Sequence, residues 1–185
     1  MSTTLLPYLR PSSWPHLHQV PHHPLLAVEG VDVPYVTYVA TTQQRVITTE
    51  LMRSQKLGLD ELAEEAMLSL SQRALDLTPR PIVETGGALL ISVTDEFAAE
   101  AVACPQLMHA AHDALGSERL AAAIPARGVL LIADGRDESS AAILSGWARE
   151  IYSEAGDLAL TPHLIMLRLG VPEGVLKAQD SATLH

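Results

Sequence analysis

Histidines are concentrated near the start of the chain, where four of the eight occur between positions 16 and 23. His16 and His18 would place both imidazoles on one side of an extended chain, and His22 and His23 could add a third ligand. Imidazole is a common ligand for zinc, copper and nickel. A metal site, however, needs ligands that converge from a rigid scaffold, and the surrounding prolines predict an irregular segment. We therefore expect neither a metal nor another cofactor, and these four histidines are the candidate ligands if a metal binds.

Carboxylates follow the closing strands of two successive predicted units. Asp95 comes after one of these strands, and Asp134 and Asp137 come after the next. If the two strands are neighbours, the carboxylates would gather at one edge of the sheet, where they could bind a hard cation or act as an acid–base pair. An aspartate between a strand and a helix is also favoured as a helix N-cap. The catalytic candidates are therefore these three aspartates, with capping as the alternative.

Other reactive residue types lack the sequence context that catalysis needs. His109 and His112 would share a helix face, but no glutamate completes a zinc-hydrolase motif, so we expect two surface histidines. Ser139 and Ser140 lack the glycines of a nucleophile elbow. Cys104 is the only cysteine, which excludes an internal disulfide, and it is expected to be a buried small hydrophobe. Whether the protein is an enzyme is left open, with the balance against it.

The composition is that of an acidic, folded protein. The chain has 22 acidic residues against 12 lysines and arginines, a formal net charge of −10, and its basic residues form no stripe. A nucleic-acid partner is therefore not expected. With 185 residues, 48% of them hydrophobic, the chain can bury a sizeable core in one domain. No apolar run approaches the roughly 18 residues of a membrane span, and no secretory signal is visible, so we expect a cytoplasmic protein without membrane contact.

A hairpin followed by a helix is predicted three times, over residues 35–76, 82–116 and 120–155. The third unit is the clearest, because apolar runs at 120–124 and 129–133 flank a turn with Pro125 and Gly128. In the second unit, Gly86-Gly87 between two apolar runs likewise predicts a hairpin turn. Parallel pairs need long crossovers, which these short turns exclude. The sequence thus predicts an α+β fold with a largely antiparallel sheet and helices packed on it, and a doubly wound parallel sheet is the alternative.

The two ends of the chain differ from this pattern. Residues 1–24 contain five prolines and four histidines, and we expect them to form an irregular N-terminal arm. Residues 25–170 would form the single α+β domain, and residues 171–185 a C-terminal tail. Trp14 in the arm is a candidate anchor for a protein partner, together with His16 and His18.

Two stretches carry a resemblance to a known family. VPYVTYVATTQQRVITTELMRSQKLGLDELAEEAMLSLSQ, and ERLAAAIPARGVLLIADG followed by a helix and LTPHLIMLRLG, resemble the bacterial YtpQ-like proteins, a family of unknown function. The resemblance covers about residues 25–170, and the block from Ile124 to Asp134 is its most specific part. It implies an α+β fold in a bacterial cytoplasmic protein, and it implies no activity. The longer members have an additional N-terminal portion, in whose place this chain has its proline- and histidine-rich segment.

Three functions are compatible with these features. The first is a small acidic accessory protein that docks on a protein partner, because no catalytic motif is present and the arm offers a docking element. The second is a metal-dependent enzyme, such as a hydrolase, that uses the carboxylate cluster. The third is an acidic inhibitor or immunity-type protein for a basic partner, which rests on the net charge alone. The sequence leaves the oligomeric state open.

Overall fold

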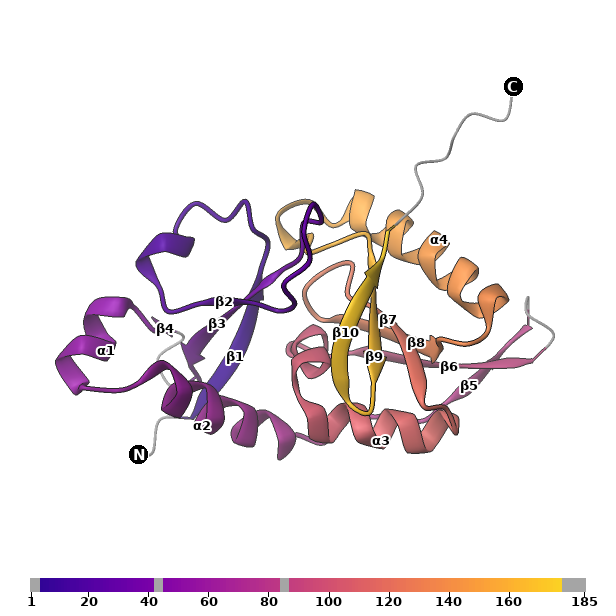
Figure 1. The fold of residues 1–185 in the computed structure, drawn as a ribbon, viewed down its shortest axis with the longest axis horizontal. Helices are drawn as coiled ribbons and strands as arrows, with labels where there is room; N and C mark the ends of the chain where they lie inside the picture. The colour runs from indigo at the N-terminus through magenta and orange to yellow at the C-terminus, as the bar shows by residue number, and fades with distance from the viewer. Residues whose placement is uncertain (1–3, 42–44, 84–86, 178–185) are drawn as a thin grey trace, which may run out of the picture.

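The structure is a computed structural model that describes residues 4–41, 45–83 and 87–177. Two antiparallel sheets lie side by side along the long axis of the molecule (Figure 1). The first sheet contains β1 (Leu5–Arg10), β2 (His23–Pro24), β3 (Tyr35–Ala40) and β4 (Arg45–Val46). The second has the strand order β10-β9-β7-β8-β6-β5. Its strands are β5 (Arg80–Ile82), β6 (Ala88–Thr94), β7 (Arg119–Ala123), β8 (Val129–Asp134), β9 (Leu164–Arg168) and β10 (Val171–Leu176).

The described residues form four α-helices, α1 (Thr49–Gln55), α2 (Leu59–Ser71), α3 (Pro105–Leu115) and α4 (Glu138–Glu154). Three of them, α2, α3 and α4, pack on strands of the sheets, which confirms the predicted α+β class. Short 3-10 helices add η1 (Leu17–Gln19), η4 (Ala99–Ala103) and η5 (Gly156–Leu158). Pro105 begins α3, in the first turn, where its missing N–H removes no hydrogen bond within the helix. Among the described residues, no helix combines the length and the hydropathy that crossing a membrane requires.

The three predicted hairpin-plus-helix units are present, but they are divided between the two sheets. The β3–β4 pair with α1 and α2 belongs to the first sheet. The β5–β6 pair with α3, and the β7–β8 pair with α4, belong to the second. Every strand pairing among the described residues is antiparallel, so the parallel alternative is wrong.

The expectation of an irregular segment over residues 1–24 is wrong at β1, which pairs along its whole length with β3. Leu6 and Leu9 are almost fully buried, so this strand is part of the core. The prolines do not prevent it, because β1 has β3 on one side only and Pro7 lies at its free edge. Leu9 directs its N–H away from β3, and alternation places Pro7 on the same side, where a missing donor costs nothing.

The expected C-terminal tail also contains a strand, since β10 pairs with β9 in a hairpin. Gly170 forms the turn with a φ of 79°, a left-handed conformation that glycine adopts without strain. The tail prediction is therefore wrong for residues 171–176, and its last residues, 178–185, lie outside the described part of the chain.

Strands β7 and β8 are buried on both faces, as their apolar runs predict. Leu120, Ala122 and Ile124 lie in a large core that also includes residues of β1, α2, η4 and α3. Ala121 and Ala123 point to the opposite face and contact a second core under α4. The larger core contains buried residues of both sheets, so it joins the two halves of the molecule.

Candidate functional site

The aspartates proposed from sequence do not form one cluster. Strands β6 and β8 are neighbours, as the hypothesis required, but they are antiparallel, and Thr94 pairs with Val129. Asp95 therefore lies beside Gly128, at the beginning of β8, and its N–H donates to the Gly128 carbonyl at 3.2 Å. Asp134 is at the opposite end of β8. The structure thus separates Asp95 from Asp134 by the length of a strand.

Each of these aspartates has a structural role. Asp95 accepts the Phe97 N–H at 3.0 Å, and Asp137 caps α4 by accepting the Ser139 N–H at 3.1 Å. Asp134 accepts the Ser117 hydroxyl at 2.7 Å and pairs with Arg136 at 3.0 Å. Partial burial raises the pKa of Asp134, but these hydrogen bonds outweigh it and hold the pKa at about 2.

The histidines proposed as metal ligands have separate surroundings. His22 bonds the Val20 carbonyl at 2.9 Å, whereas the Nε2 of His23 lies 3.0 Å from the Tyr38 hydroxyl. His16 and His18 are exposed on the loop that contains η1. No three His, Cys, Asp or Glu side chains come together as a possible metal site within the described ranges.

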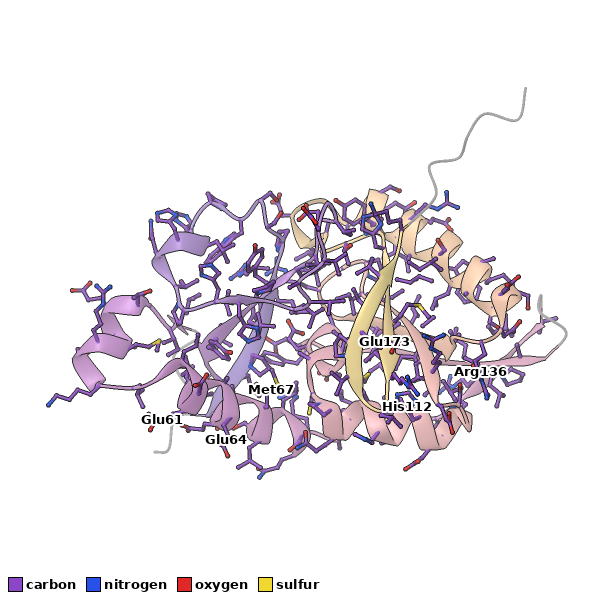
Figure 2. The ribbon with its side chains drawn as sticks, in the orientation of Figure 1. Glu61, Glu64, Met67, His112, Arg136 and Glu173 are labelled. Atoms are coloured by element: carbon purple, nitrogen blue, oxygen red, sulfur yellow. The ribbon has the colours of Figure 1, made fainter. Side chains whose placement is uncertain are left out.

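The histidine pair on α3 differs from the expected two surface residues. His109 is exposed, but His112 is buried, and Figure 2 places it on α3 at the base of the second sheet. Its Nδ1 lies 2.6 Å from the Ser117 carbonyl, just beyond the end of the helix. This bond satisfies Nδ1, whereas Nε2 is buried without a hydrogen-bond partner among the described residues, and helical spacing alone could not reveal this burial.

A stack of aromatic rings and arginine lies where the first sheet meets the second. The Arg10 guanidinium is 4.5 Å from the centre of the Tyr8 ring and 4.4 Å from the centre of the Trp14 ring. The Trp14 ring in turn contacts the His16 ring edge to face, with 5.6 Å between the ring centres. The sequence-predicted partner residues Trp14 and His16 are therefore adjacent, and they are attached to β1 rather than to a loose arm.

Tyr8 also connects this stack to the second sheet. Arg127, in the turn between β7 and β8, donates to the Tyr8 hydroxyl at 2.5 Å. Beneath it, the fully buried Glu100 of η4 accepts the Leu9 N–H at 2.9 Å. Burial raises the pKa of Glu100 to about 7, although this hydrogen bond and the positive charges of Arg127 and Arg10 oppose the rise.

A pocket of about 560 Å³ opens beside the stack, and we call it the β1–α2 pocket. Its walls come from β1, β3, the end of α2 and the segment after β6, and they include Leu6, Tyr8, Arg10, Val39, Ser69, Arg73, Glu96 and Phe97. The Arg73 guanidinium lies 4.9 Å from the centre of the Phe97 ring and 3.5 Å from an Asp95 oxygen. Two arginines, each packed on an aromatic ring, therefore line one pocket.

Sequence reasoning missed most of this site. Tyr8, Arg10, Arg73 and Arg127 come from distant segments, and no spacing connects them. Glu100 did carry a signal, since it is the single charged residue in the apolar run from Phe97 to Cys104. A lone carboxylate in such a run is buried only if it is paired or hydrogen-bonded, which predicts a structural partner elsewhere in the fold.

The comparisons with known proteins add no relative. No family model, no curated protein and no solved structure matches this chain. The resemblance to the YtpQ-like family therefore stays a prediction, and the proposals below rest on the geometry of the chain itself.

Proposed function

We propose that this protein is an accessory protein that docks on a protein partner through the surface formed by Trp14, His16 and His18, which we call the Trp14 surface. The observation that supports this is the placement of Trp14, which is half-buried against Arg10 and still presents part of its indole to solvent. Tryptophan and arginine are the residue types that contribute most to binding at protein interfaces.

The loop that holds Trp14 is ordered by its own backbone. The Trp14 N–H donates to the Pro11 carbonyl at 3.0 Å, and the Leu17 N–H donates to the Trp14 carbonyl at 3.2 Å. The Gln19 N–H donates to the His16 carbonyl at 3.0 Å in the next turn. A loop already held in one conformation loses little conformational entropy on binding, which favours affinity.

The side chains around Trp14 indicate the chemistry of the partner. Arg10 is cationic, and His16 and His18 are exposed polar side chains close to it in the chain. The fitting partner surface is an apolar pocket for the indole with acidic side chains at its rim. The carboxylate arrangement that a metal-dependent hydrolase would need is not supported, because its members occupy opposite ends of β8.

The test compares three forms of the full chain. Proteins recovered by affinity purification with the wild type are compared with those recovered by Trp14→Ala and by Tyr152→Ala. Tyr152 is the matched control, because it is an aromatic residue, 37% exposed, on α4. A partner recovered with the wild type is then purified, and its dissociation constant is measured for each form.

We expect Trp14→Ala to weaken that complex by at least about tenfold, the effect of losing an aromatic anchor, while Tyr152→Ala leaves it unchanged. Thermal melting of each variant shows whether the fold is intact. Equal affinity of the wild type and Trp14→Ala for every recovered partner would exclude the Trp14 surface as the docking element.

A further inference from the structure

The β1–α2 pocket is lined by two arginines whose Nε–H groups lack acceptors among the described residues. The Nε–H groups of Arg10 and Arg73 are both buried, and neither donates to any of the described residues. A buried donor without an acceptor destabilises the protein, and more so when the group is charged. The Nε atoms are covered by the protein itself, but both side chains line the pocket, so a ligand there could accept from the terminal nitrogens of two guanidinium groups.

The packing of the two guanidinium groups determines which ligand atoms they can bind. Arg10 lies between the Tyr8 and Trp14 rings, and Arg73 lies over the Phe97 ring. When the faces of a guanidinium are occupied by rings, its donors remain in its plane, where its terminal N–H groups can bind the oxygens of a carboxylate or phosphate. Arg10 is therefore oriented for an oxyanion, whereas one terminal nitrogen of Arg73 already donates to Asp95 at 3.5 Å.

The two arginines are also connected through their aromatic neighbours. The Tyr8 and Phe97 rings contact each other edge to face, with 6.3 Å between their centres. These rings hold two guanidinium groups that come from different elements, Arg10 from β1 and Arg73 from the segment just after α2. Such rigid placement before binding reduces the entropy lost when a ligand enters.

The rest of the lining limits the size and charge of the ligand. A volume of about 560 Å³ is in the range of small-molecule sites. Leu6 and Val39 provide apolar surface, and the Ser69 hydroxyl adds a polar group. The exposed carboxylate of Glu96 at the rim, and the net charge of −10, disfavour a polyanion such as a nucleic acid.

We propose that the β1–α2 pocket binds a small, partly apolar organic oxyanion, a carboxylate or a phosphate, through the guanidinium groups of Arg10 and Arg73. This binding needs no protein partner, so it stands independently of docking through the Trp14 surface. The partner would contact the exposed side of Trp14, whereas the oxyanion enters beside Tyr8 and Phe97.

The experiment is a titration of the purified full chain with benzoate and, separately, with inorganic phosphate, at constant ionic strength maintained with chloride. NMR spectra of the arginine Nε–H groups report on the two guanidinium groups. We expect saturable shifts of the Arg10 and Arg73 signals. Saturation by benzoate alone would identify a carboxylate site with apolar contacts, and saturation by phosphate would identify a phosphate site, and either result supports the proposal.

Three variants with equal loss of charge test the assignment. Arg10→Gln and Arg73→Gln should each weaken binding by at least about tenfold, the effect of removing one charge-assisted hydrogen-bonding group. Arg80→Gln is the control, since the side chain of Arg80 is 76% exposed on β5 and does not line the pocket, and it should bind as the wild type does.

A fourth variant keeps the test valid if the loss of Arg10 disturbs β1. Ser69→Leu retains both arginines but places a larger side chain in the pocket, and it should reduce binding to a similar extent. The absence of saturable binding by both probes, or unchanged binding in Arg73→Gln or Ser69→Leu, would overturn the proposal. Arg73→Gln should also leave docking through Trp14 unaffected, which separates failure of this site from failure of the proposed function.

Discussion

The carboxylate of Glu100 accepts the backbone N–H of Leu9 at 2.9 Å, and the two residues are 91 positions apart in the chain. Leu9 lies at the free edge of β1, and Glu100 lies in η4, which contacts both β1 and β8. Together with Pro7, which has no N–H, this bond leaves little of that strand edge available for pairing with another chain. The second oxygen of Glu100 is buried without a hydrogen bond among the described residues, so ionisation of this group is costly.

The first prediction is that wild-type stability falls as the pH rises from 4.5 to about 7. Burial raises the folded-state pKa of Glu100 from 4.5 to about 7, so the folded protein holds its proton where the unfolded chain has released it. The stabilising contribution is complete below pH 4.5 and is lost as the pH approaches 7. The loss is on the order of 3 kcal/mol, and urea unfolding at a series of pH values measures it.

The variant Glu100→Gln tests the source of this slope. Glutamine keeps an acceptor for the Leu9 N–H and has no charge, so its unfolding free energy should vary much less between pH 4.5 and 7. The variant should also be more stable than the wild type at pH 8. A wild-type slope that persists in Glu100→Gln would show that another group causes it.

A second prediction concerns the acidic limb of the same profile. The pKa of Asp134 is about 2 in the folded protein, below its usual 3.8, so its contribution is present above pH 3.8 and is lost as the pH falls towards 2. The variant Asp134→Asn should be less stable than the wild type at pH 6, and the difference should shrink at pH 2. Because the side chain is partly exposed, we expect an effect below about 1 kcal/mol by urea unfolding. If the wild type and Asp134→Asn differed in unfolding free energy by the same amount at pH 6 and pH 2, this prediction would be contradicted.

The local elements could be predicted from the sequence, and their pairing could not. The turn at residues 125–128 and the apolar runs beside it give β7 and β8 directly. β1 was missed, because the position of Pro7 at a free edge depends on which strand lies on its other side. The division into two sheets depends in the same way on contacts between distant segments, which no local pattern contains.

The candidate site shows the same limit. Asp95 and Asp134 each follow a strand, as the sequence indicates, but only the antiparallel pairing of β6 with β8 reveals that they are apart. Trp14 was identified by its residue type. Its attachment to Arg10 follows from the position of β1, and this attachment makes Trp14 part of a defined surface.

A third prediction tests the connection between the two sheets. The variant Tyr8→Phe removes the hydroxyl that accepts from Arg127 while it retains the ring beside Arg10. It should lower the unfolding free energy by about 1–2 kcal/mol, the usual effect of losing a hydrogen bond to a charged group. Tyr152→Phe, which changes an exposed ring on α4, is the control and should be neutral within about 0.5 kcal/mol. Equal stability of the two variants in urea unfolding would show that the bond contributes nothing.

The last prediction compares the effect on stability of replacing two glycines by alanine, Gly135 just before α4 and Gly146 within it. A Cβ at Gly135 would lie 2.9 Å from the Leu120 carbonyl carbon and 3.1 Å from the Ala121 nitrogen. These are backbone atoms of β7, a central strand that cannot move without disturbing both cores. Gly135→Ala should therefore destabilise the protein by about 1–3 kcal/mol, as overpacking does elsewhere.

Gly146 provides the opposite case within the same helix-strand unit. A Cβ there meets no atom within 4 Å, and the residue lies inside α4. Gly146→Ala should stabilise the protein by about 0.5–1 kcal/mol, because alanine loses less backbone entropy than glycine in a helix. Thermal and urea unfolding of both variants measure the two effects. The same substitution is made at both positions, and only the space around the new methyl group differs. Changes of the same sign in the unfolding free energy of the two variants would therefore contradict the close approach of Gly135 to β7.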